Sequence, residues 1–180
     1  MAKRRLLFPL EDRSLISDLR AGDLINIDGW ILCARDATHR KILKSIQEGC
    51  FHLDLKNQLI YYVGPTPAPP GKIIGSCGPT TAKRMDEYLE EFLKHGIIAT
   101  MGKGKRSLSI RDLHRKYQAI YLITFGGAGA YLSQFVKKVE IIAWQDLGPE
   151  ALFRIQVKDF PAIVGIDTLG QDFYELSSAV

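Results

Sequence analysis

The sequence lacks the features that mark membrane and secreted proteins. No apolar run approaches the roughly 20 residues needed to cross a bilayer. The apolar part of the opening segment is also too short for a secretory signal peptide. Internal repeats and long linkers are missing as well, so residues 1–180 are predicted to form one domain. We expect a cytoplasmic protein.

Cysteine is scarce in this chain. Cys33, Cys50 and Cys77 lie far apart in the sequence. This spacing matches neither a C-x-x-C metal site nor the disulfide framework of a secreted domain. Buried packing is the expected role of such cysteines, and no metal site is predicted on this chain.

The charge balance is modest. The formal net charge is +4, and the basic residues are spread along the chain apart from short clusters at 3–5 and 103–106. Such a balance suits the binding of small anions better than the coating of a nucleic acid. The basic segments also lack interleaved aromatic side chains for base stacking. We therefore expect neither nucleic acid nor membrane among the partners.

Short apolar segments are plentiful, by contrast. Hydrophobic residues make up 46% of the sequence, enough for a sizeable core. Segments rich in β-branched or aromatic residues and bounded by Gly, Pro or Asp predict strands. These segments are 24–27, 30–33, 59–63, 97–101, 119–124, 139–144, 152–157 and 163–166. Helical patterns lie between them, so the fold class is predicted to be α/β.

Two helices are predicted from periodicity and end signals. Apolar residues recur at helical spacing over 82–95, and Gly96 marks the end of that helix. A second helix is predicted from Asp36 to about residue 48, with Asp36 as its N-cap. The proline-rich stretch 64–71 is predicted to be an extended surface loop.

Cations stand close to the start of both predicted helices. Arg35 directly precedes one helix, where the dipole disfavours a positive charge, and this position indicates a role toward an anion. An ion pair with a surface carboxylate is the alternative. In 78–86, Thr80 or Thr81 can cap the other helix while Arg84 lies in its first turn. Free N–H groups and an arginine together can receive a carboxylate or phosphate, although an ordinary capped helix with a solvated basic turn fits as well.

Two glycine-containing segments follow predicted strands. Lys103 lies in the segment 102–106, at the place where open α/β sheets bind ligands, but the spacing is not that of a P-loop. A solvated basic run is the alternative for this segment. The segment 125–130 lacks the G-x-G-x-x-G order of dinucleotide-binding proteins. It is predicted to serve close backbone packing or a turn near the site.

Together and in this order, these motifs resemble the C-terminal domain of class I fumarases, which in many organisms is a separate β subunit, and the related β subunit of L-tartrate dehydratase. The most specific match is GPTTAKRMD at 78–86. The other matching stretches are 21–23, 34–39, 102–104, 125–128 and 159–162. Thr38 and Lys105 depart from the family pattern at flanking positions, which weakens the choice between fumarase and tartrate dehydratase.

The resemblance implies a swivelling β/β/α three-layer domain that docks on a larger α subunit. That partner is expected to carry a 4Fe-4S cluster, in a hetero-oligomer such as α2β2. The implied reaction is the reversible hydration of fumarate to L-malate. The alternatives are the β subunit of an L-tartrate dehydratase and a non-catalytic anion-binding module.

The resemblance also implies roles for four residues. Arg35, Arg84 and Lys103 correspond to ligands of the carboxylates of a small dicarboxylate substrate. Fixed cations of this kind stabilise the negative charge that grows when a proton leaves the carbon beside a carboxylate. Thr80 corresponds to the residue placed at that proton. Its hydroxyl is a weak base at neutral pH, so the resemblance couples it to an aspartate of the partner.

Overall fold

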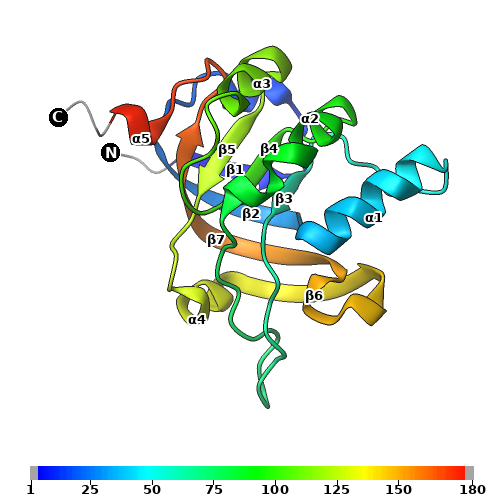
Figure 1. Ribbon diagram of the computed structural model, residues 1–180. Helices are drawn as coiled ribbons and strands as arrows, with labels where there is room; N and C mark the ends of the chain where they lie inside the picture. Colours follow the sequence, from blue (N-terminus) through cyan, green and yellow to red (C-terminus); the bar gives the residue numbers. More distant parts are fainter. Residues whose placement is uncertain (1–3, 177–180) are drawn as a thin grey trace.

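The computed structural model describes residues 4–176 and contains one mixed sheet with helices packed on it (Figure 1). The strands are β1 (Arg4–Phe8), β2 (Leu24–Cys33), β3 (Leu59–Tyr61), β4 (Ala99–Gly102), β5 (Ile120–Ile123), β6 (Val136–Ala143) and β7 (Leu152–Ile166). The α-helices are α1 (Asp36–Gln47), α2 (Asp86–Lys94), α3 (Ile110–Tyr117), α4 (Gly129–Leu132) and α5 (Phe173–Leu176). The 3₁₀ helices are η1 (Arg13–Ile16), η2 (Ala82–Met85), η3 (Ser133–Phe135) and η4 (Gln145–Glu150).

The sheet closes on itself. Its strand order is β1-β2-β3-β4-β5-β7-β6, and β7 pairs in addition with β2. The strands β2, β3, β4, β5 and β7 therefore form a ring, with β1 beside the first half of β2 and β6 beside the first half of β7. The strands β2, β3, β4 and β5 are mutually parallel, so their carboxyl ends share one edge.

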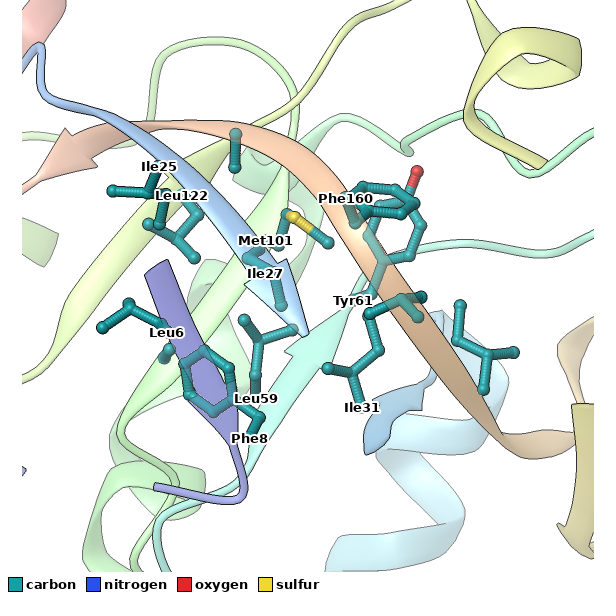
Figure 2. Close-up of a cluster of buried hydrophobic side chains, with 14 of the residues drawn as sticks. Leu6, Phe8, Ile25, Ile27, Ile31, Leu59, Tyr61, Met101, Leu122 and Phe160 are labelled. Atoms are coloured by element: carbon teal, nitrogen blue, oxygen red, sulfur yellow. The ribbon is translucent and has the colours of Figure 1, made fainter. Parts of the chain in front are cut away.

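Two apolar cores lie on the two faces of this ring. Along β3, Leu59 and Tyr61 belong to the inner core whereas Ile60 belongs to the outer one, as the two-residue period of a strand requires. In the outer core, the apolar faces of α1, α2 and α3 cover the ring (Figure 1). Figure 2 shows the inner core, where the labelled side chains are Leu6, Phe8, Ile25, Ile27, Ile31, Leu59, Tyr61, Met101, Leu122 and Phe160.

The predicted α/β class is confirmed, but several boundaries differ. The segments 24–27 and 30–33 form one strand, β2, because a register shift beside Gly29 leaves the pairing with β7 intact. The segments 152–157 and 163–166 are likewise parts of one strand, β7, which continues past Asp159 at a φ of 56°. The strand β1 was not predicted. Its short apolar stretch follows a basic start and carries no turn signal before it.

The predicted helix 82–95 is divided. A 3₁₀ turn, η2, precedes α2, and neither Thr80 nor Thr81 caps it with a side chain. Thr81 occupies the N-cap position of η2 with the extended backbone usual there, but its side chain makes no capping hydrogen bond, and its backbone forms a bridge with Lys103. Asp36 is also not an N-cap, because Arg35 occupies that position and Asp36 is the first helical residue. Gly96, at a φ of 97°, follows α2 as predicted.

The proline-rich stretch belongs to a long excursion between β3 and η2 that projects away from α1, α2 and α3 (Figure 1). Two hydrogen bonds close its base. The Thr66 N–H donates to the Ser76 carbonyl at 3.0 Å, and the Ser76 N–H donates to Thr66 Oγ1 at 2.8 Å. The predicted surface loop is thus confirmed. Among residues 4–176 no helix is long and apolar enough to cross a membrane.

Candidate functional site

The cationic segments meet at the edge formed by the carboxyl ends of the parallel strands. Arg35 follows β2, and Lys103 follows β4. Thr80 lies at the end of β3, where its N–H donates to the Tyr62 carbonyl at 2.7 Å. This is the edge at which open α/β sheets bind ligands.

Thr80 and Lys103 are joined through their backbones. The Lys103 N–H donates to the Thr80 carbonyl at 3.1 Å, and the Ala82 N–H donates to the Lys103 carbonyl at 2.9 Å. Residues 80–82 therefore extend the sheet by a short segment inserted between the ends of β3 and β4. Within residues 4–176 the Thr80 hydroxyl has no hydrogen-bond partner, and its side chain is half-buried.

Lys103 lies against the glycine-rich segment that follows β5. A Cβ on Gly126 would stand 3.1 Å from Lys103 Cδ, so the lysine stem packs closely on the bare glycine backbone. Gly129 meets the loop before Thr80 closely, since a Cβ there would be 2.8 Å from the Gly78 nitrogen. The predicted close packing of 125–130 is confirmed. No ion pair joins the Lys103 ammonium to another described residue.

Arg35 lies beside a carboxylate of this chain. Its Nη2 is 3.5 Å from Glu150 Oε1, while Glu150 Oε2 accepts a hydrogen bond from the Ala37 N–H at 2.9 Å. Glu150 therefore caps the start of α1 from a distant part of the chain. Arg35 Nε is buried and has no partner among the described atoms. The ion pair named as the alternative role of Arg35 is present, and it leaves part of the guanidinium unused.

Arg84 is bound by Asp36 through two hydrogen bonds. Arg84 Nε donates to Oδ1 at 3.2 Å, and Arg84 Nη2 donates to Oδ2 at 2.7 Å. The side chain of Arg84 is 50% exposed and that of Asp36 is 20% exposed. The first residue of α1 is thus connected to the 3₁₀ turn that follows Thr80.

Arg35 and Arg84 line the same cleft, whose volume is about 630 Å³. Three arginines face two carboxylates in this lining, and the excess of positive charge suits an anion. Thr80 and Lys103 are not part of the lining. The structure therefore brings two of the four predicted residues into the cleft and places the other two at the neighbouring strand ends. The cleft is lined by Arg35, Asp36, Ala37, Arg40, Arg84, Leu147, Pro149 and Glu150.

Two cleft residues were missed by the sequence analysis. Arg40 follows Asp36 by four positions, and this helical spacing could have revealed it. Its Nη1 is 3.4 Å from the Tyr88 hydroxyl oxygen. Glu150 had no such signal, because its contacts with α1 join distant parts of the sequence.

A buried arginine beneath the site was also missed. The Arg106 side chain is 0% exposed, its Nε donates to Asp86 at 2.7 Å, and its guanidinium lies between the Tyr62 and Tyr121 rings. Asp86 also accepts a hydrogen bond from the Ser107 N–H at 2.9 Å. This network ties the Lys103 loop to the start of α2.

His39 supports the turn that carries Arg35. Its Nδ1 lies 2.8 Å from the Arg35 carbonyl, and its ring packs among Tyr62, Tyr88 and Phe92. Burial lowers the pKa of His39 to about 4, so the imidazole is neutral at pH 7 and donates to that carbonyl. His39 is thus a structural anchor for Arg35.

The described residues do not fit a resident metal centre. Cys33 and Cys77 are buried, and burial raises the pKa of Cys33 far above its usual range and that of Cys77 to about 12. Cys50 is exposed. Over residues 4–176 there is no group of three or more His, Cys, Asp or Glu side chains that could hold a metal ion.

The fold and the site define a mixed α/β domain that presents cations at the carboxyl ends of its parallel strands. The family model described as Fumarase C-terminus matches residues 5–177. The chain belongs to this family, which confirms the resemblance found in the sequence.

Individual relatives agree with this assignment. Fumarate hydratase 2 of Leishmania major is 38% identical over 170 residues, covering 93% of this chain and 30% of that protein. The anaerobic class I fumarate hydratase of Escherichia coli is 38% identical over 154 residues, covering 84% of this chain and 28% of that protein. The chain thus spans less than a third of these enzymes. A putative L(+)-tartrate dehydratase subunit beta of Methanocaldococcus jannaschii is 35% identical over 167 residues, covering 89% of this chain and 86% of that protein.

Proposed function

We propose that this chain is the β subunit of a 4Fe-4S-dependent class I fumarate hydratase, a hydro-lyase that interconverts fumarate and L-malate. The observation that carries the proposal is the pair Arg35 and Arg84 in one cleft at the strand ends of a chain of this family. The cytoplasmic location and the swivelling β/β/α arrangement implied by the resemblance are part of the same proposal.

The chain's part in substrate binding is electrostatic. Arg84 can hold one carboxylate with two parallel hydrogen bonds, since a guanidinium matches the planar geometry of a carboxylate. Arg35 offers a second guanidinium in the same cleft. Lys103, with an ammonium that no described residue engages, supplies a third cation at the adjacent strand end. A small dicarboxylate is the ligand class that such a set of cations recognises.

In the reaction, this chain is assigned two tasks: accepting the proton that leaves the substrate carbon and stabilising the negative charge on the neighbouring carboxylate. Dehydration of a hydroxy acid removes a proton from the carbon beside a carboxylate, and negative charge then grows on that carboxylate. Cations at Arg35, Arg84 and Lys103 stabilise this charge. Because they are already in place, no reorganisation of solvent is needed during the reaction. We assign this proton to Thr80, whose hydroxyl has no hydrogen-bond partner among the described residues. It passes the proton to a stronger acceptor, which we assign to the partner.

The partner is proposed to be a cluster-bearing α subunit in a hetero-oligomer such as α2β2. The likeness to a subunit supports a separate partner: the relative from Methanocaldococcus jannaschii, 35% identical to this chain, is named as a putative L(+)-tartrate dehydratase subunit beta. The cysteines of this chain do not fit a cluster, so the 4Fe-4S cluster is assigned to the α subunit.

A second candidate function is that of an L-tartrate dehydratase β subunit. The relative from Methanocaldococcus jannaschii favours it, because that relative is named as a putative subunit beta of this enzyme and is 35% identical to this chain. Tartrate differs from malate by one hydroxyl group, and the same cations would bind its carboxylates. Residues that choose between the substrates are therefore expected outside this set of cations.

The proposal is tested by co-expressing the chain anaerobically with a candidate cluster-bearing subunit and measuring turnover of fumarate, L-malate and tartrate. Fumarate and malate are expected to be the preferred substrates, and preference for tartrate would select the second candidate. A complex that contains the cluster but converts none of the three would refute both.

The location of the cluster is tested separately on the isolated chain. Anaerobic reconstitution followed by iron counting is expected to leave no stoichiometric iron on it. Iron that is retained, and is lost on Cys33→Ala, Cys50→Ala or Cys77→Ala substitution, would place the cluster on this chain instead.

A further inference from the structure

Asp36 engages only one face of the Arg84 guanidinium. A guanidinium offers five N–H donors, arranged as a side face of Nε and Nη2 and an end face of Nη1 and Nη2. The two hydrogen bonds from Asp36 use Nε and Nη2, which is the side face. Nη1 has no partner among residues 4–176, so the end face stays available for a second carboxylate.

Asp36 is itself held in place. It is the first residue of α1, where a carboxylate is favoured by the positive end of the helix dipole. The next residue, Ala37, is bound through its N–H by Glu150. The carboxylate of Asp36 therefore stands on a fixed helix end rather than on a free loop.

Arg84 has no comparable support of its own. It lies in η2, a single 3₁₀ turn, and half of its side chain is exposed. A long exposed side chain of this kind samples many rotamers, and ordering it on ligand binding has an entropic cost. The bond to Asp36 removes part of that freedom before a ligand arrives.

We propose that Asp36 is a positioning residue, which binds the side face of Arg84 and thereby presents its end face to a substrate carboxylate in the cleft. The inference rests on the proposed function, because it assigns the second carboxylate to the dicarboxylate substrate. Asp36 stays bound to Arg84 while the substrate binds, and the arginine bridges the two carboxylates.

Simple electrostatics predicts the opposite effect of removing Asp36. If Asp36 only repelled an anionic substrate, or had to be displaced by it, Asp36→Asn would lower KM. If Asp36 positions Arg84, the same substitution raises KM, because an amide cannot accept both hydrogen bonds from the side face. The sign of the change in KM therefore separates the two roles.

The experiment uses the active complex of this chain with its cluster-bearing partner. Asp36→Asn is expected to raise KM about tenfold and to lower kcat by a smaller factor, which indicates lost binding rather than lost chemistry. The double variant Asp36→Asn/Arg84→Lys should be no worse than Arg84→Lys alone, since Asp36 acts only through Arg84. The thermal midpoint should change little, because exposed ion pairs contribute little to stability.

Asp146→Asn is the matched control. Asp146 lies 3.5 Å from Lys41 of α1 and is 73% exposed, so its substitution also removes one acidic group near this helix without touching Arg84. It is expected to leave KM unchanged. An unchanged or lowered KM in Asp36→Asn, or additive losses in the double variant, would overturn the inference. A wild-type complex that turns over neither fumarate nor tartrate would instead overturn the proposed function, and the inference with it.

Discussion

Two adjacent threonines at the end of β3 differ in what their backbones do. The Thr80 N–H and carbonyl both bond to neighbouring strand ends, whereas Thr81 forms the bridge to Lys103 and begins the 3₁₀ turn. Neither hydroxyl caps the helix. This finding removes capping as an explanation for any effect of substituting Thr80 or Thr81.

Thr80→Ala is expected to lower kcat of the reconstituted complex by on the order of 10²-fold or more, with a smaller change in KM, if the hydroxyl takes part in proton transfer. Folding should be nearly unaffected, because no hydrogen bond of the described chain uses that hydroxyl. The measurement is kcat with cluster content checked in each preparation.

Thr81→Ala is the control for this prediction. Its kcat should stay close to that of the wild type. Equal and mild losses for Thr80→Ala and Thr81→Ala would mean that the pair is structural and that the partner handles the proton alone.

Among the elements, the loop 102–107 depends on a buried ion pair. Arg106 leaves the cationic run and lies between two tyrosine rings, where Asp86 and the Thr100 hydroxyl bind it. Sequence reasoning placed Arg106 with its basic neighbours, because nothing in a run of lysines and arginines marks the one that turns inward. Burial of one member is decided by Tyr62, directly after β3, and Tyr121 in β5.

Arg106→Met is expected to lower the free energy of unfolding by about 3–5 kcal/mol, because it removes the buried guanidinium from the core and leaves the largely buried Asp86 carboxylate without its partner. Urea unfolding of the isolated chain measures the change. Asp86→Asn should lose at least as much, since it leaves the fully buried Arg106 guanidinium without its counter-charge, although the amide oxygen can still accept a hydrogen bond from the Ser107 N–H. A loss below about 1 kcal/mol in Arg106→Met would indicate that the pair acts as a weak surface pair does.

The elements also show where sequence reasoning succeeds and where it ends. Local signals predicted the α/β class, the glycine after α2 and the close packing of 125–130 correctly. Long-range pairing was beyond them: the bridge between Thr81 and Lys103, which adds residues 80–82 to the sheet edge, was not predicted. The same limit hid Glu150, which caps α1 from 113 positions away in the chain.

Across the whole molecule, two buried histidines couple stability to pH. Burial lowers the pKa of His39 to about 4, and burial together with the nearby Arg106 charge lowers that of His114 to about 3. Both are neutral in the folded chain, whereas in the unfolded chain they gain protons below their ordinary pKa of 6.5. Their contribution to stability is therefore complete above pH 6.5 and is lost as the pH falls toward 4 and 3.

His114→Leu is expected to reduce this pH dependence. When the pH falls from 7.5 to 5, each buried histidine should lower the free energy of unfolding by about 2 kcal/mol. The wild type should therefore lose both contributions, whereas His114→Leu should lose only the contribution of His39. Asp28 does not interfere, because it stays ionised over this pH range. Burial raises the pKa of its carboxyl, but hydrogen bonds from Asp159, Lys158 and Arg5 lower that pKa by more, to about 2. Urea midpoints at the two pH values test the prediction, and equal losses in wild type and variant would contradict it.

The closure of the ring has a consequence for how the chain is made. β7, the last strand of the ring in the sequence, pairs with both β2 and β5. Until residue 166 has left the ribosome, those two strands keep open edges, and open edges recruit strands of other chains. A fragment that ends at residue 150 should therefore scatter light as aggregates where the full chain stays monodisperse. We expect newly made chains to depend on shielding of these edges during synthesis.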